Sequence, residues 1–170
     1  MNIIPVLLKE FEKETITTRE MLSRIPDTIY DWKPHPRSMT VRTLATHLAE
    51  LPSWVDMVFH TDGLDFATMD YTPTVINNTT DLLKLYDQCY AKGHAALEEG
   101  QESVLEKTWT LRNGDIILAT DNKLETLRMV YCQIVHHRAQ MGVYLRLNDV
   151  PIPPSYGPSA DEGSLSQSQK

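Results

Sequence analysis

The stretch VRTLATHLAELPSWVDMV, residues 41–58, decides the fold class. Its apolar residues recur at alternating intervals of three and four positions, which is the spacing of one buried stripe on an α-helix. The residues of this stripe are Val41, Leu44, Leu48, Leu51, Val55 and Val58. Thr40, directly before the stripe, is a residue type that caps helix N-termini, so we expect the helix to begin there. Pro52 falls inside the pattern and should kink the helix rather than end it.

Three other segments repeat apolar residues at the same helical spacing. They run from Ile4 to Arg24, from about Thr80 to Glu99 and from about Asn122 to Asn148. Pro26 should end the first of them and Gly100 the second, because proline cannot continue a helix and glycine favours its C-terminal end. The sequence therefore predicts an all-α fold, a four-helix bundle.

The connections between these helices are long. Residues 61–79 lose the helical period and contain Asp-Gly and Thr-Pro turn signals. Asn113-Gly114, between two β-prone runs, predicts a short type I′ β-hairpin before the last helix. From Val150 onward the chain is rich in Pro, Ser and Gly, so it should wrap the surface and then fray. We expect one domain over residues 1–160 and a flexible tail over 161–170.

Length and composition limit the classes of function. A chain of 170 residues can support one full core, and a hydrophobic content of 41% indicates a globular protein. The net charge of −7, without a Lys- and Arg-rich stripe, argues against nucleic acid as a partner. No apolar run approaches the roughly 18–20 residues that span a bilayer, and the acidic N-terminus is unlike a signal peptide. We therefore expect a cytoplasmic protein with no membrane partner.

His47 and His137 are the strongest candidates for a functional site among the six histidines. Both lie on or beside faces that the periodicity turns inward, on two separate helices, and bundle interiors are where facing helices bring metal ligands together. Gln133 lies four positions before His137, so the two side chains stack one turn apart, as two ligands of one ion must. The pattern favours a metal site of His47, His137 and Gln133. The alternative is that each histidine is a hydrogen-bonded core residue.

The other histidines are weaker candidates. His136 is rotated by about 100° from His137 on the helix, so the two side chains cannot both point into one site. His35 and His60 fall in or beside loops, and His94 lies on a helix whose neighbours offer no partner. We expect these three side chains to be solvated.

Four polar residues lie near the candidate histidines. Arg138 and Gln140 could orient a metal ligand or cap polar groups within the bundle, and we favour the structural role for both. Glu50 and Asp56 could act as an acid, a base or a further ligand, but such helix carboxylates are more often solvated. The sequence assigns no catalytic residue.

Four short motifs occur in a specific order along the chain. They are WKP at 32–34, SMTVRTLATHLA at 38–49, HHRAQ at 136–140 and PSYG at 154–157. Taken together, they resemble the DinB/YfiT-type, or DinB-like, superfamily over roughly residues 5–160. The resemblance implies a four-helix bundle with a crossover between the second and third helices, frequent homodimerisation, and a divalent metal, Zn²⁺ or Ni²⁺, held by three histidines.

The resemblance also assigns the ligand positions. The first histidine maps onto His47 and the last onto His137, while Gln133 stands where the superfamily has the remaining one. An amide oxygen is a weaker donor than imidazole for zinc or nickel, so we expect weaker binding than three histidines would give.

Two hypotheses of function follow. The first is a metal-dependent transferase, possibly thiol-dependent, or hydrolase acting on a small molecule, because superfamily members include thiol-dependent transferases and isomerases. The second is a non-catalytic homodimeric binding bundle whose metal site has degenerated, which Gln133 favours.

Overall fold

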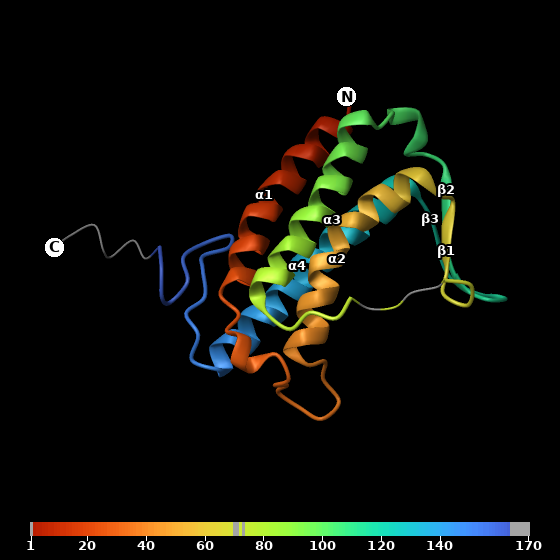
Figure 1. Ribbon diagram of the computed structural model, residues 1–170. Helices are drawn as coiled ribbons and strands as arrows, with labels where there is room; N and C mark the ends of the chain where they lie inside the picture. Colours follow the sequence, from red (N-terminus) through yellow and green to blue (C-terminus); the bar gives the residue numbers. More distant parts are fainter. Residues whose placement is uncertain (1, 70–71, 73, 164–170) are drawn as a thin grey trace.

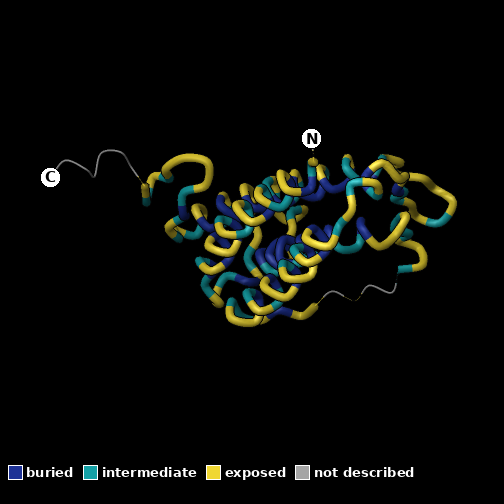
Figure 2. Tube along the Cα trace, turned by 90° about the horizontal axis from the view of Figure 1, so that it is seen from above, coloured by how far each residue is buried: buried dark blue, intermediate teal, exposed yellow. Residues whose placement is uncertain are grey.

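The computed structural model describes residues 2–69, 72 and 74–163. Four long helices pack around one core, and a small sheet lies beside the end where α2 finishes and α4 begins (Figure 1). The helices are α1 (Ile4–Ser23), α2 (Val41–His60), α3 (Thr79–Glu99) and α4 (Lys123–Leu147). Figure 2 shows that the buried residues follow the inward sides of these helices. The four predicted helices are confirmed.

Side-chain caps explain where three of the helices begin, with Asn78 capping α3 through the backbone nitrogen of Asp81. The hydroxyl of Thr40 accepts a hydrogen bond from the backbone nitrogen of Thr43 at 3.2 Å, as its position before the apolar stripe predicts. Asn122 forms a capping box with Glu125 at the start of α4, in which each side chain bonds the other residue's backbone nitrogen. The caps satisfy amide groups that the first helical turn leaves without partners.

Helix α2 is the central element, because it packs against both α3 and α4. The start of α3 lies beside the start of α2, where the Arg42 guanidinium donates to the Asn77 side chain at 2.9 Å. At the other end, Gly100 after α3 packs against the Phe59 ring near the end of α2. Helices α2 and α3 therefore run in the same direction. Their backbones meet closely at Gly93, where a β-carbon would lie only 2.3 Å from the carbonyl oxygen of Pro52.

The β-hairpin before α4 is present, but its predicted turn type is wrong. Strands β2 (Thr108–Asn113) and β3 (Ile116–Asn122) pair antiparallel around the turn Gly114-Asp115. Only Gly114 has a positive φ there, whereas a type I′ turn needs two such residues. The Asp65 carboxylate accepts a hydrogen bond from the Gly114 nitrogen at 2.8 Å, so a tertiary contact shapes this turn.

A third strand, β1 (Gly63–Asp65), was not predicted from the sequence. It lies in the long connection after α2 and pairs in parallel with β2. Three residues are too few to show the period of two that identifies a strand. The fold is thus mostly helical with a small sheet, rather than purely α-helical.

The C-terminal segment, residues 150–163, lies along the outside of the helices (Figure 1). Glu162 forms an ion pair with Arg24 at 2.7 Å, and Asp161 forms one with Arg146. The start of the expected flexible tail is thus fastened to α1 and α4, and residues 164–170 lie outside the described residues. None of the described helices has both the length and the apolar character needed to cross a membrane.

Candidate metal centre

His47 on α2 and His137 on α4 lie next to each other, as the sequence predicts. Their ring centroids are 4.8 Å apart and the ring planes meet at 79°. Both residues are partly exposed, so the pair lies at the edge of the core rather than inside it. Contact between α2 and α4 thus brings together two imidazoles that are 90 positions apart in the sequence.

Gln140 sets the protonation of the His137 ring. The Nδ1 atom of His137 lies 2.9 Å from Oε1 of Gln140, which can only accept, so Nδ1 carries the proton. Partial burial lowers the pKa of His137, the hydrogen bond with Gln140 opposes this, and the neighbouring His47 and His136 lower the pKa further; the net lowering favours the neutral ring. A neutral ring that donates from Nδ1 keeps a lone pair on Nε2, the state that metal-binding histidines adopt. The Gln140 amide thus fixes the orientation of the His137 ring, and a role in orienting a metal ligand stays a prediction.

Gln133 lies one turn before His137 on α4, and its side-chain nitrogen donates to the Met129 thioether at 3.0 Å. This contact directs the amide nitrogen toward the start of α4. The role of Gln133 as a third ligand stays a prediction. Among the described residues, no three side chains of His, Cys, Asp or Glu gather in a way that could hold a metal.

The donor set can be judged by its chemistry. Two imidazoles suit Zn²⁺ or Ni²⁺, and a single amide oxygen adds a weak, hard donor. The residues present therefore fit a divalent ion, with lower affinity than three histidines would provide. His136 is exposed, and its ring centroid lies 5.0 Å from that of His137.

A cavity of about 410 Å³ opens beside His47, and we call it the His47 cavity. The described residues that line it are Met39, Arg42, Thr43, Thr46, His47, Thr74 and Val75. Thr46 is 95% buried, and its hydroxyl oxygen has no hydrogen-bond partner among the described residues. The sequence reasoning missed Thr46, although a polar residue within the buried part of α2 was a usable signal.

The remaining candidates have structural partners. Glu50 is half-buried and accepts a hydrogen bond from the Thr74 hydroxyl at 3.4 Å. Asp56 lies 2.9 Å from His60 on the surface. The expectation of a solvated His94 is wrong, because its two ring nitrogens lie 3.1 Å from Glu12 and 3.3 Å from Glu98. Glu98 lies one turn after His94 on α3, so this partner was visible in the sequence and was overlooked, whereas Glu12 comes from α1 and was not.

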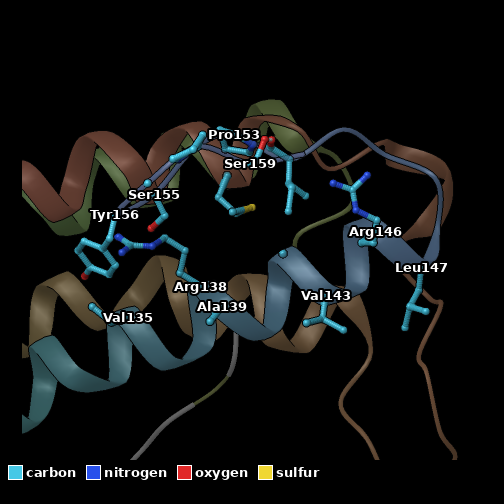
Figure 3. Close-up of a pocket in the computed structure, with 15 residues that line it drawn as sticks. Val135, Arg138, Ala139, Val143, Arg146, Leu147, Pro153, Ser155, Tyr156 and Ser159 are labelled. Carbon is cyan, nitrogen blue, oxygen red and sulfur yellow. Dashed lines mark hydrogen bonds between the residues drawn. The ribbon is translucent and has the colours of Figure 1, made fainter. Parts of the chain in front are cut away.

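Arg138 has the structural role that we expected. Its side chain is 3% exposed and donates to Glu14 on α1 at 2.5 Å and to the Thr18 hydroxyl at 3.0 Å. Tyr156 of the C-terminal segment donates to the same Glu14 carboxylate at 2.8 Å. In Figure 3, the Arg138 side chain extends toward the Tyr156 ring, and its guanidinium carbon lies 5.3 Å from the ring centroid.

A second cavity, of about 580 Å³, lies between α4 and the C-terminal segment (Figure 3). One wall is the α4 face that carries Val135, Ala139, Val143 and Leu147, and the other includes Pro153 and Tyr156. Val143 and Leu147 are each 58% exposed. We call this surface the α4 apolar face.

Solved structures with the same fold include DinB-like proteins. One from Bacillus subtilis is 21% identical with a TM-score of 0.68, and the match covers 90% of this chain and 99% of that one. A putative DinB family member from Exiguobacterium sibiricum is 23% identical with a TM-score of 0.66, covering 88% and 93%. No curated protein matches the chain.

A mycothiol-dependent maleylpyruvate isomerase also shares the fold, at 18% identity and a TM-score of 0.60. That match covers 82% of this chain and 60% of the isomerase. The model of the DinB family matches residues 1–169, almost the whole sequence. The chain belongs to the DinB family.

Proposed function

We propose that this protein binds one divalent metal ion, Zn²⁺ or Ni²⁺, through His47 and His137 and uses it in a reaction on a small molecule. The observation that carries the proposal is the contact between the two rings, 4.8 Å apart, with burial favouring the neutral form of His137 and Gln140 orienting its ring. Gln133 is the proposed third, weak ligand.

The proposed reaction is transfer or hydrolysis, with a low-molecular-weight thiol as a candidate co-substrate. A bound divalent ion polarises substrate oxygens and lowers the pKa of a bound water or thiol. The fold shared with a mycothiol-dependent isomerase supports the thiol. The His47 cavity supports a small-molecule substrate, because 410 Å³ lies within the range of about 300–1,000 Å³ typical of ligand pockets.

Titration calorimetry with Zn²⁺ tests the proposal. We expect the wild type to bind one ion per chain and His47→Ala to weaken binding by more than about tenfold, because losing even an outer-shell partner costs roughly 10–100-fold. His136→Ala is the matched control, since it removes an exposed imidazole beside the site, and it should leave the affinity unchanged. A wild type that binds no zinc, or equal losses in the two variants, would refute the proposal.

A second candidate function is a homodimeric binding module without catalysis. The contact of the Gln133 amide with Met129 favours a degenerate metal site, and the exposed α4 apolar face offers a surface for a second copy of the chain. A large exposed apolar patch next to polar residues is typical of interaction sites.

The mass of the protein in solution tests the proposed dimer. Light scattering should give twice the chain mass of 19.4 kDa for the wild type and the single mass for Val143→Asp. Ile16→Asp replaces an exposed aliphatic residue on α1, outside the α4 apolar face, and should stay dimeric. A monomeric wild type would rule out this dimer.

A further inference from the structure

We propose that the cavity between α4 and the C-terminal segment, which we call the C-terminal cavity, binds a small, uncharged apolar molecule. Its volume of about 580 Å³ lies within the range of about 300–1,000 Å³ typical of ligand pockets. Val135 and Ala139 on its wall are each two positions from His137, or about 200° of helical rotation. The cavity therefore lies on the other side of α4 from the candidate metal centre, and the inference does not depend on the metal function.

Four prolines stiffen the outer wall of the C-terminal cavity. They are Pro151, Pro153, Pro154 and Pro158, within the segment of residues 150–163. Each proline ring fixes φ near −65°, so a segment that contains four of them has little freedom to collapse onto α4. Pro153 and Pro158 themselves line the cavity.

Polar contacts also fasten this outer wall to the helices. The Tyr156 hydroxyl donates to Glu14 on α1 at 2.8 Å. Further along, Asp161 pairs with Arg146 on α4, and Glu162 pairs with a residue of α1. Together with the prolines, these anchors make the cavity a preformed feature of the fold. A preformed pocket lowers the entropy cost of binding a ligand.

The charges around the C-terminal cavity are already paired within the protein. Arg138 bonds the Glu14 carboxylate and Arg146 bonds the Asp161 carboxylate, and no acidic side chain is among the described lining residues. Within the part of the chain that the structure describes, no fully buried polar side-chain atom of this wall lacks a hydrogen-bond partner. A charged ligand would lose its hydration here without gaining a counter-ion, which is costly. The cavity thus favours an uncharged ligand.

Gly142 forms part of the cavity floor, and packing does not explain why it is a glycine. It is buried in the interior of α4, where glycine destabilises a helix relative to alanine. Among the described residues, a β-carbon at this position would meet only the Met21 side chain, at 3.5 Å, which is an ordinary contact. The missing side chain instead leaves space inside the cavity. The neighbouring Val143 and Leu147 make this space apolar, so it suits an aliphatic or aromatic body.

A second copy of the chain is the alternative occupant, but the size of the cavity favours a small molecule. Fifteen residues line the cavity, as Figure 3 shows. A stable interface between two proteins takes about 20–30 residues from each partner. A second copy would therefore have to cover a surface that extends well beyond the cavity, whereas a small molecule matches its volume.

The probe is 1-octanol, and octanoate and octylammonium supply the same body with a negative or a positive charge. Binding is followed by the methyl NMR signals of Met21, Val143 and Leu147, which line the cavity. We expect 1-octanol to shift these signals saturably and to bind at least about tenfold more tightly than either charged probe, because a charge would be buried without a partner. Octanoate or octylammonium binding as tightly as 1-octanol would overturn the proposal.

Ala139→Trp tests the location of the site. Ala139 is exposed and lines the cavity, so the indole should fill the space without disturbing the core and should weaken 1-octanol binding by more than about tenfold. Ala91→Trp is the matched control, since Ala91 is an exposed helix alanine on α3 that does not line this cavity. It should leave binding unchanged.

Two results would overturn the ligand site. One is the absence of a saturable shift in the wild type, and the other is an equal loss of binding in the two tryptophan variants. If the wild type shows no shift and is a dimer that Val143→Asp dissociates, the α4 apolar face serves the second copy of the chain instead. Neither result bears on Zn²⁺ binding at His47 and His137, so the metal function is tested separately.

Discussion

Replacing Arg138 by alanine is expected to lower the free energy of unfolding by about 3–5 kcal/mol, the usual cost of removing one partner of a buried ion pair. Arg138 is nearly fully buried, and the carboxylate that it neutralises, Glu14, is only 12% exposed. The substitution leaves that charge without its cation and the Thr18 hydroxyl without its donor. Urea-induced unfolding followed by circular dichroism measures the loss.

Arg128→Ala is the matched control. Arg128 also joins α4 to α1 through a carboxylate, Glu10, at 2.6 Å, but both side chains are well exposed. Exposed pairs contribute only about 0–1 kcal/mol, so this variant should stay close to the wild type. If the two substitutions cost the same, the buried network around Arg138 does not stabilise the fold as described.

Replacing Gln133 by histidine is expected to raise the affinity for Zn²⁺ by at least about 100-fold. The change supplies a third imidazole at the i−4 position from His137, in place of a weak amide donor, and even outer-shell partners are worth roughly 10–100-fold. Competition with a chromophoric chelator measures the affinity.

Gln88→His is the control for this gain. Gln88 is exposed on α3, and no histidine lies three or four positions from it, so the new imidazole has no second imidazole one turn away with which to hold zinc. Its affinity for zinc should match that of the wild type. Equal gains from the two variants would mean that Gln133 is not beside the metal.

The helices were predictable because their signals are local. The apolar stripe in residues 41–58 and the Thr40 cap are both patterns formed by residues close together in the sequence. The turn at Gly114 and the strand β1 were not, because each depends on pairing between distant segments, such as Asp65 with Gly114. Local sequence patterns therefore predicted the helices and the hairpin, but not the contacts between distant segments that shape the Gly114 turn and add strand β1.

The candidate site, too, was predictable from the sequence only in part. Periodicity alone placed His47 and His137 on inward faces, and the structure brings the rings together. The bond from His137 to Gln140 and the missing partner of Thr46 depend on side-chain rotamers, which no sequence period encodes. Long-range contacts such as that of His94 with Glu12 are equally invisible to helical spacing.

X-ray absorption at the zinc edge, on protein loaded with one equivalent of Zn²⁺, tests the central claim most directly. We predict the multiple scattering of two imidazole rings with nitrogen at about 2.0–2.1 Å from zinc, and the loss of one ring in His47→Ala and in His137→Ala. A spectrum with only oxygen ligands, or one that neither substitution changes, would contradict a metal centre built on these two histidines.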